Sequence, residues 1–432
     1  MERFRKLGLS SEILEVIKQA GFSEPTEIQE KAIPLAVAGK DIIGGSSTGS
    51  GKTLVFASSI IQNLKQTGKT QALVLTPTRE LAEQVSKVFK RFSKNSKLHT
   101  TAIYGGVGMG EQIRQLQFSD IVIGTPGRIL DHLGRRNLDL SHVKVLVLDE
   151  VDRMFDMGFR RDVEKIIGFC PKKRQTMLFS ATISSDIDYL AKKHTQNAVE
   201  VAVKSNVDPA KLRQVYYDIF SNQKFSLLVH LLKKEASSLV MVFTNTRRMA
   251  DFLEKNLKKN NIDALAIHGG LSQNKRTKIL ERFHGQGVKV LVCTDVAARG
   301  LDIKGVTHVY NFDIPPVSND YIHRIGRTAR AGKEGIAVSL IGSKDYDNFS
   351  RVMKIENINI ERTEVPKFEQ IEVKTNYGSR EKHFGNRNFR RESGRSENRN
   401  FSRSRNSPRD SRVRPRQNSG RFNNSFRRAR RN

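Results

Sequence analysis

The stretch Ile42–Thr53, which reads IIGGSSTGSGKT, decides the fold. Its two β-branched residues predict a buried strand, its glycine-rich segment predicts a turn, and a helix is expected from Leu54. Backbone amides in such a turn can wrap a phosphate, and the helix N-terminus adds positive potential. The strict phosphate-loop pattern has glycine where this chain has Ser46, so the match is partial. The residues expected to contact a nucleotide here are Ser46, Ser47, Thr48, Gly49, Ser50, Gly51, Lys52 and Thr53.

Two residues of this loop have specific expected roles. Lys52 would reach the β- and γ-phosphates, and the Thr53 hydroxyl would bind Mg²⁺. Asp149 and Glu150 follow another apolar run and should lie where parallel strands bind ligands. Asp149 is expected to hold Mg²⁺, partly through water, and Glu150 to deprotonate an attacking water. An acidic pair after a strand is otherwise often a solvated turn, but the phosphate loop favours the catalytic interpretation.

Apolar runs of strand length alternate with amphipathic stretches along the chain, which predicts parallel sheets covered by helices on both faces. The runs are Ile42–Ile43, Ala72–Leu75, Ile121–Ile123, Val145–Leu148 and Met177–Phe179, followed by Leu239–Phe243, Ala264–Ile267, Val288–Cys293, Val306–Tyr310 and Ile336–Ile341. The interruption between the two series predicts two α/β domains. We expect a first domain at 1–203, a polar linker at 204–214, a second domain at 215–365 and a tail at 366–432.

The charge balance limits the classes of partner. The 432 residues carry a formal net charge of +30, which indicates a polyanion, because Lys and Arg neutralise phosphates and release counterions. Solubility is the simpler alternative. No run approaches the ~18 consecutive apolar residues of a membrane span, and the N-terminus does not read as a secretory signal. Cys170 and Cys293 are interpreted as buried packing residues, and we expect a cytoplasmic protein.

The C-terminal tail differs in composition from the rest. Lys374–Asn432 contains 19 Lys and Arg against 4 Asp and Glu, which is half of the net charge. Apolar periodicity ends near Glu364, and such a segment cannot bury enough apolar surface to form a core, so disorder is expected. Aromatic residues are interleaved with the arginines, and both can stack on bases. The tail is predicted to bind RNA without sequence preference; a merely solvating tail is the alternative.

Over about residues 4–345 the chain resembles the DEAD-box RNA helicases. The acidic box of that family reads Asp149-Glu150-Val151-Asp152 here, with valine in place of the usual alanine. The resemblance implies two tandem RecA-like domains and RNA-stimulated hydrolysis of ATP with Mg²⁺. We expect a monomeric core. Upstream, Gly21-Phe22 and Pro25–Gln29 match the segment that reads adenine. By resemblance, the Gln29 amide hydrogen-bonds the base and the Phe4 ring stacks on it, which implies ATP rather than any nucleoside triphosphate.

Further family motifs of the first domain suit contacts with the RNA backbone. The matching segments read PTRELA, GG and TPGR, and they supply Thr and Arg side chains and exposed glycine amides. Each alone is as easily a loop or a helix cap, but together they occur in the family's order. Ser180-Ala181-Thr182 resembles the segment that couples hydrolysis to strand separation, so Ser180 and Thr182 are expected to sense the acidic box through Asp152. The expected RNA contacts are Thr78, Arg79, Gly105, Gly106, Thr125 and Arg128.

The second domain has no phosphate loop of its own. Its segments Val242–Thr246, His268–Arg276, Thr294–Asp302 and His323–Arg330 match family motifs in order. The resemblance implies that Asp302 approaches the ATP ribose. Arg327 and Arg330 match arginine fingers, which stabilise charge on the transferred phosphoryl group, and they share one face if this stretch is helical. Ala329 stands where glycine is common. The RNA contacts implied for this domain are Gln273, Arg276, Thr294 and Gly300.

The split site implies a mechanism in which the first domain holds ATP·Mg²⁺ and the second supplies arginines. RNA bound across both domains would favour closure of the cleft and would locally separate a short duplex. A DNA-directed helicase or remodeller, and an ATP-gated RNA clamp without processive unwinding, are the alternatives. Stronger stimulation of the ATPase by DNA than by RNA would favour the first of these. Ribonucleoprotein and ribosome-assembly partners are compatible with the sequence.

Overall fold

The computed structural model describes residues 1–45, 50–182, 184–203, 212–234, 239–298, 303, 305–329, 334–355 and 358–372. Several predicted features lie outside these residues, namely 204–211 of the linker, Lys374–Asn432 of the tail, and the site residues Ser46, Ser47, Thr48, Gly49, Gly300, Asp302 and Arg330. The described residues up to Val203 are called the first half below, and those from Leu212 to Glu372 the second half. Each half contains one parallel sheet, so the expected fold class is confirmed.

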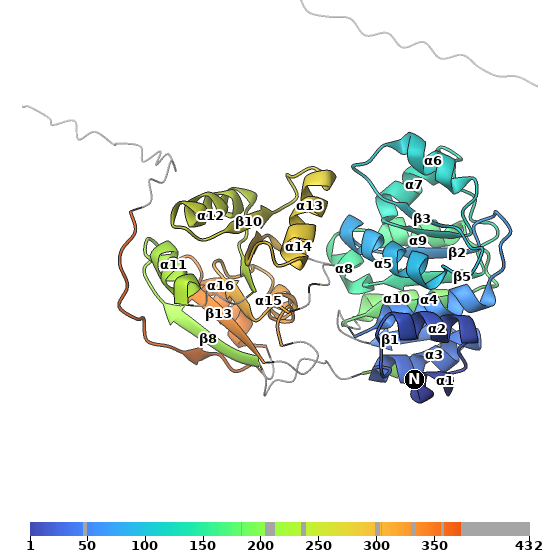
Figure 1. Ribbon diagram of the computed structural model, residues 1–432, viewed down its shortest axis with the longest axis horizontal. Coiled ribbons are helices and arrows are strands. Elements are labelled where there is room, and N and C mark those ends of the chain that lie inside the picture. The colour runs from blue at the N-terminus through green and yellow to red at the C-terminus, as the bar shows by residue number, and fades with distance from the viewer. Residues whose placement is uncertain are drawn as a thin grey trace, which may run out of the picture. The chain divides into compact units, whose positions relative to one another are not determined.

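The first half is a seven-stranded parallel sheet in the order β3-β4-β2-β5-β6-β1-β7 (Figure 1). Its strands are β1 (Ile42–Gly45), β2 (Ala72–Leu75), β3 (Thr100–Ile103), β4 (Ile121–Gly124), β5 (Val145–Asp149), β6 (Gln175–Ser180) and β7 (Val199–Ala202). Its helices are α1 (Glu2–Arg5), α2 (Ser11–Gln19), α3 (Glu27–Val37), α4 (Lys52–Asn63), α5 (Arg79–Phe92), α6 (Met109–Leu116), α7 (Pro126–Gly134), α8 (Val151–Asp156), α9 (Arg160–Gly168) and α10 (Ser185–His194).

Two apolar layers enclose this first sheet. Alternate residues of a strand point to opposite faces, so Val74 and Val147 pack with α2 to α5, whereas Leu75 and Leu148 pack with α7 to α10. Burial on both faces explains why the central strands read as continuous apolar runs. The same geometry brings the carboxyl ends of β1, β2, β4, β5 and β6 to one edge of the sheet, where the motif residues follow.

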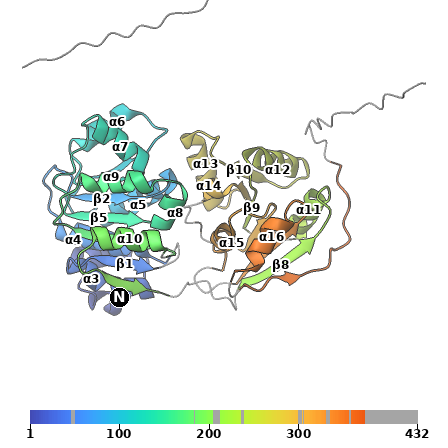
Figure 2. The same ribbon diagram turned by 180° about the vertical axis from the view of Figure 1, so that it is seen from behind.

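The second half is another seven-stranded parallel sheet, in the order β10-β11-β9-β12-β13-β8-β14. Its strands are β8 (Leu212–Asp218), β9 (Val240–Phe243), β10 (Ala264–Ile267), β11 (Val290–Cys293), β12 (His308–Asn311), β13 (Gly335–Ile341) and β14 (Glu361–Arg362). Its described helices are α11 (Lys224–Lys234), α12 (Arg247–Lys259), α13 (Gln273–His284), α14 (Asp295–Ala298), α15 (Ser318–Ile325) and α16 (Tyr346–Met353), which lie on both faces of the sheet (Figure 2).

The two sheets have the same strand order. If each strand of the first half is matched to the strand seven places later, the two orders become identical. Lys52 begins the helix after the first strand of its sheet, and Lys224 begins the helix after the first strand of the other. Thr78 and Thr246 are likewise the N-caps of the helices after the second strand of each half. The chain therefore presents two versions of one scaffold.

The fold differs from the expectation in three places. Strand β3 was not expected, because Thr100-Thr101 masks its short apolar pattern, and β7 is an exposed edge strand. Strand β8 already includes Leu212–Gln214, which overlap the expected linker. Packing also continues past residue 365, since Phe368 and Ile371 pack against the core beside α11. Single anchoring side chains on an extended segment give no periodic signal.

Two expectations drawn from composition can be compared with the described residues. Cys170 and Cys293 are both buried and free, as their apolar surroundings predicted. Among the helices that the structure describes, none combines the length and the apolar character needed to cross a membrane.

Candidate nucleotide and nucleic-acid site

The phosphate loop is held against the segment expected to read adenine. Gly51 has φ +95°, a conformation that favours glycine, and a side chain there would put its Cβ 2.3 Å from Gln29 Nε2. Gln29 Nε2 donates to the Gly51 carbonyl oxygen at 3.1 Å, and Gln29 Oε1 accepts from the Thr26 amide. The Thr26 hydroxyl donates to the Ser50 carbonyl oxygen at 2.7 Å. Direct hydrogen bonds therefore join the segment expected to read the base to Ser50 and Gly51 of the loop expected to bind phosphate.

Lys52 and Asp149 form the charged centre of the site expected to bind the nucleotide. Both are buried, and Lys52 Nζ lies 4.0 Å from Asp149 Oδ1. Burial raises the pKa of the Asp149 carboxyl to about 6; Lys52 opposes that shift, and Glu150 and Asp152 add to it. Asp149 Oδ1 has no hydrogen-bond partner within the described part of the chain. A buried carboxylate oxygen without a donor among the described residues, 4.0 Å from the Lys52 ammonium at the start of α4, fits a Mg²⁺ site.

Glu150 is fixed in an unusual conformation at the end of β5. Its φ of 56° and ψ of 54° place a non-glycine residue in the left-handed region, which occurs at strained functional positions. The side chain is buried, and Glu150 Oε2 accepts a hydrogen bond from Arg153 Nη1 at 2.9 Å. Arg153, on the first turn of α8, is buried as well. The carboxylate is thus oriented before any substrate binds.

The acidic box contacts the Ser-Ala-Thr segment directly. Asp152 Oδ2 accepts hydrogen bonds from the amides of Ala181 and Thr182 and from the Thr182 hydroxyl, at 3.1, 3.2 and 3.3 Å. The Ser180 hydroxyl donates to the Thr182 carbonyl oxygen at 2.6 Å. The structure therefore brings together all three residues that were expected to couple hydrolysis to strand separation.

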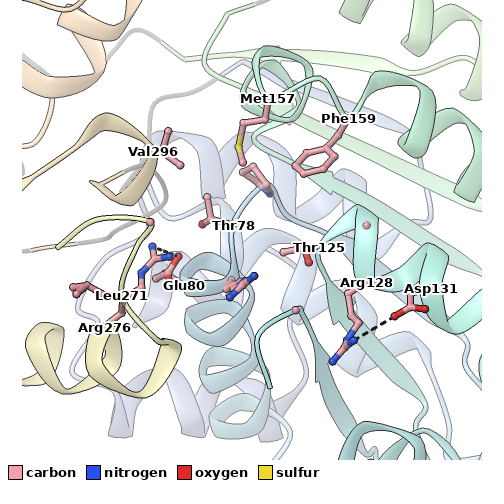
Figure 3. Close-up of a pocket in the computed structure, with 15 residues that line it drawn as sticks. Thr78, Glu80, Thr125, Arg128, Asp131, Met157, Phe159, Leu271, Arg276 and Val296 are labelled. Carbon is pink, nitrogen blue, oxygen red and sulfur yellow. Dashed lines mark hydrogen bonds and ion pairs between the residues drawn. The ribbon is translucent and has the colours of Figure 1, made fainter. Parts of the chain in front are cut away.

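A cavity of about 470 Å³ collects residues that were expected to contact RNA (Figure 3). Its described lining includes Thr78, Arg79, Gly105, Thr125, Arg128 and Arg276. Thr78 and Thr125 are the N-caps of α5 and α7, so both lie at helix N-termini, and the Thr78 hydroxyl accepts from the Leu81 amide. Helix N-termini and guanidinium groups that line one hollow form a surface suited to phosphate groups.

Two arginines of this cavity are held in place by glycine-rich backbone and by polar partners. The guanidinium of Arg79 lies against Gly105 and Gly106, and a Cβ on Gly106 would come within 2.1 Å of Arg79 Nη1. Arg128 donates to Gln112 Oε1 at 3.0 Å and to the Val107 carbonyl oxygen at 2.6 Å. Its pair with Asp131 at 3.3 Å is drawn in Figure 3. Pre-positioned guanidinium groups lose less entropy when they bind phosphate.

The RNA residues expected in the second half differ in their surroundings. Gln273 Nε2 donates to Glu80 Oε1 at 3.0 Å. Arg276 Nη2 pairs with Glu80 Oε2, also at 3.0 Å (Figure 3). Thr294 is buried, and its carbonyl oxygen accepts from the amides of Ala297 and Ala298. Gln273 and Arg276 therefore engage a glutamate of the PTRELA segment in this structure.

The helical arrangement considered for the arginine fingers does not hold at Arg327. Helix α15 ends at Ile325, and Ala329 has φ +53°, which an α-helix cannot accommodate. Arg327 itself is buried. Arg324 forms a fork with Asp295, with Nε and Nη2 at 2.6 and 2.7 Å from the two carboxylate oxygens. The positive φ of Ala329 is a conformation that favours glycine, the residue that the resemblance led us to expect there.

Phe4 occupies a different environment from the one that its expected role suggests. Its ring is fully buried in the core formed with α2 and α3. Stacking on adenine would require one face of the ring to be reached by the base, and that role stays a prediction.

Several site residues were not anticipated from the sequence. Arg153 positions Glu150, Gln112 bridges Arg128 and His132, and Glu80 receives Gln273 and Arg276. The i, i+3 spacing of Glu150 and Arg153 on one helical turn was the only local signal among these. The other contacts join segments that are distant in sequence.

The fold and site together define a class: a two-domain phosphate-loop nucleoside triphosphatase of helicase type. The chain matches the DEAD/DEAH box helicase family over residues 26–190 and the helicase conserved C-terminal domain over residues 223–332. It is 42% identical over 373 residues to the DEAD-box ATP-dependent RNA helicase CshA of Geobacillus kaustophilus, covering 86% of this chain and 80% of the relative. The Listeria monocytogenes ATP-dependent RNA helicase CshA is 44% identical over 348 residues, covering 80% and 67%.

Solved structures agree with this comparison. S. cerevisiae Dbp5 bound to RNA and ADP BeF3 matches with a TM-score of 0.76 and 32% identity, covering 84% of this chain and 95% of that one. The DEAD-box helicase Mss116 bound to ssRNA and UDP-BeF matches with a TM-score of 0.75 and 30% identity, covering 84% and 79%. The chain belongs to the DEAD-box ATP-dependent RNA helicases, enzymes that hydrolyse ATP. The expected resemblance is confirmed, and the RNA-directed interpretation is favoured over the DNA-directed one.

Proposed function

We propose that this chain uses Glu150 as the base that activates water, and that RNA-dependent closure of its two halves completes the hydrolytic site. The observation that carries this proposal is the buried Glu150, held by Arg153 in a left-handed conformation directly after Asp149. A base must be oriented toward one water to be effective, and a fixed buried carboxylate meets that requirement.

The remaining roles are those that the resemblance to the family implies. Lys52 binds the β- and γ-phosphates, and Asp149 and Thr53 hold Mg²⁺, which neutralises charge on the phosphates when it is bound. Arg327 and Arg330 of the second half stabilise charge on the transferred phosphoryl group, and Asp302 binds the ribose. Since Arg327 is buried in this structure, its approach to ATP requires rearrangement of the turn that contains Ala329.

RNA binds across the cavity lined by Thr78, Arg79, Thr125 and Arg128, with few contacts to base edges. The link to hydrolysis runs through Asp152, which bonds to the Ser180–Thr182 segment. RNA that favours closure binds more tightly to the ATP-bound state, and by linkage it raises the affinity for ATP to the same extent. Local separation of a short duplex is the expected result.

The decisive variant is Glu150→Gln, because it keeps the shape of the side chain and removes its basicity. We expect RNA-stimulated release of phosphate to fall by about 10²–10⁴-fold with little change in ATP affinity. Glu164→Gln on the surface of α9 is the matched control and should retain the parent rate. A Glu150→Gln variant that hydrolyses ATP as fast as the parent would disprove the assignment of the base. Parallel assays with DNA of the same sequence should show weaker stimulation than with RNA.

The basic segment Lys374–Asn432 is proposed to add sequence-independent affinity for RNA. Deleting it should weaken RNA binding and flatten the dependence of the dissociation constant on salt, because fewer counterions are released. The basal ATPase should be retained, because the deleted residues supply none of the groups assigned to hydrolysis. An unchanged salt slope would contradict this role. Fluorescence anisotropy of labelled single-stranded RNA at several salt concentrations provides the measurement.

A further inference from the structure

The second half contains a buried lysine in the position that Lys52 occupies in the first half. Lys224 begins α11, directly after the first strand of its sheet, as Lys52 begins α4. Lys224 Nζ lies 4.0 Å from Asp313 Oδ1 beyond the end of β12, and Lys52 Nζ lies 4.0 Å from Asp149 Oδ1 at the end of β5. Strands β5 and β12 hold the same place in the two sheet orders. The lysine–carboxylate pair of a nucleotide site is thus repeated where the sequence has no phosphate loop.

A second carboxylate lies against this repeated lysine. Asp345 Oδ2 is 2.9 Å from Lys224 Nζ and accepts from the Gly342 amide at 3.0 Å. Asp345 Oδ1 accepts from the Ile314 amide at 3.3 Å. One lysine and two backbone amides around an anionic group are the donors by which a phosphate loop holds a phosphate. Gly342 allows this close approach, since a Cβ there would meet Ser221 Oγ at 2.6 Å.

The Asp345 side chain does not have the orientation that is usual for an aspartate at a helix N-cap. Asp345 is the N-cap of α16, but its carboxylate makes no capping hydrogen bond to that helix. Ser184, the N-cap of the corresponding helix α10, does cap its helix by accepting from the Ile187 amide. An N-cap Asp usually stabilises its own helix by accepting a hydrogen bond from a backbone amide. Asp345 makes no such bond and pairs with Lys224 instead.

From these contacts we propose that Asp345 is a built-in anion that occupies the phosphate position of the second half. Its carboxylate neutralises Lys224 where a nucleotide phosphate would otherwise bind, so this half binds no nucleotide of its own. Asp313, the other carboxylate near Lys224, holds the segment that follows β12 against the segment that follows β9. Asp313 accepts from the Asn245 amide at 3.0 Å, and Asn245 Oδ1 in turn accepts from Arg324 Nη2 at 2.9 Å. This inference concerns the second half alone and does not depend on the proposed base or on closure.

The test replaces Asp345 with serine, the residue type that caps the corresponding helix α10 of the first half. Asp345→Ser removes the carboxylate, restores a capping hydroxyl and leaves Lys224 buried without its nearest partner. The melting temperature of the full chain should fall by about 5–10 °C. Inorganic phosphate, titrated at constant ionic strength, should then recover at least half of this loss. The parent should gain less than about 2 °C over the same titration, which corrects for general salt effects.

A matched double variant and a local measurement separate anion binding from general stabilisation. Lys224→Met combined with Asp345→Ser should lose the response to phosphate, because the cation that binds the anion is gone. Hydrogen exchange at the amides of Gly342 and Ile314 should speed up in Asp345→Ser and slow again with phosphate. If Asp345→Ser does not fold in chloride buffer, its refolding yield should be at least threefold higher in phosphate. A single variant that responds to phosphate no more than the parent or the double variant overturns the proposal.

Discussion

The two halves of this chain share a strand order, a lysine at the start of the corresponding helix and a carboxylate 4.0 Å from it, yet the chemistry expected of them differs. In the first half, β6 ends at the neutral Ser180, and the neutral residues Ala181 and Thr182 follow it. In the second half, the segment after β13 brings Asp345 to 2.9 Å from Lys224. The comparison teaches that the sheet supplies positions at its carboxyl edge, and that the loops decide whether a position stays available to a ligand or is filled by the protein.

The largest effects should come from removing each lysine in turn. Lys52→Met should lower kcat/KM for ATP by about 10²–10³-fold, because the phosphates lose a preorganised cation. Lys224→Met should instead lower the free energy of unfolding by about 3–5 kcal/mol, because Asp345 is left buried without its partner. Steady-state ATPase assays and urea denaturation measure the two effects.

The control for the lysine pair is Lys31→Met, which removes an exposed i, i+4 partner of Glu27 and should change stability by less than about 0.5 kcal/mol. If Lys224→Met impairs ATP turnover as strongly as Lys52→Met while the chain remains equally stable, the two lysines do not differ in role as predicted.

Intermediate effects are expected at the glycine pairs that face an arginine in each half. A Cβ on Gly106, where φ is +85°, would lie 2.1 Å from Arg79 Nη1, whereas one on Gly270 would lie 3.1 Å from His268 Nδ1 and 3.6 Å from Cδ of Arg247, the arginine of the second half. Gly106→Ala should therefore displace Arg79 and raise the dissociation constant for single-stranded RNA about tenfold, equivalent to about 1.4 kcal/mol. Gly270→Ala should raise it less than about threefold. Fluorescence anisotropy measures both dissociation constants. An equal rise in the two variants would mean that the two arginine–glycine contacts contribute equally to RNA binding.

The smallest effect concerns Ala329, which has φ +53° in the turn after α15. Ala329→Gly should raise the free energy of unfolding by up to about 1 kcal/mol, because glycine adopts this conformation without steric strain. The melting temperature should rise by about 2–4 °C. Ala191→Gly within α10 should act in the opposite direction, since glycine destabilises a helix interior by about 1 kcal/mol. A loss of stability in Ala329→Gly would show that the turn is not strained.

The sequence predicted a strand most accurately where the whole strand is one continuous apolar run. Ala72–Leu75 and Ala264–Ile267 were predicted to the residue as strands, because buried parallel strands are continuous apolar runs. Strand β3 begins with two threonines, and β7 is largely exposed, so neither has a continuous run to detect. Phe368 and Ile371 anchor an extended segment one side chain at a time, which periodicity cannot reveal.

The order and residue types of the motifs predicted which side chains belong to the candidate site. They did not predict the hydrogen bonds and ion pairs that hold those side chains in place. Arg153 could be inferred from its spacing to Glu150, because both lie on one helical turn. The pairs of Glu80 with Gln273 and of Lys224 with Asp345 join residues more than a hundred positions apart. The Lys224–Asp345 pair depends on the strand order of one sheet, whereas the Glu80–Gln273 pair joins the two halves, and a single sequence specifies neither.

The hydrogen bonds of Gln29 have a consequence for the selection of nucleotides. Both ends of its amide are engaged by the protein, through the Thr26 amide and the Gly51 carbonyl oxygen. An amide held in this way cannot rotate to exchange donor for acceptor when a different base arrives. In the proposed adenine-reading role, a guanine nucleotide would meet mismatched polar groups, and any shift of Gln29 to relieve the mismatch would pull on the loop that holds the phosphates. Recognition of the base and alignment for hydrolysis would then fail together, so a wrong nucleotide would be rejected in turnover as well as in affinity.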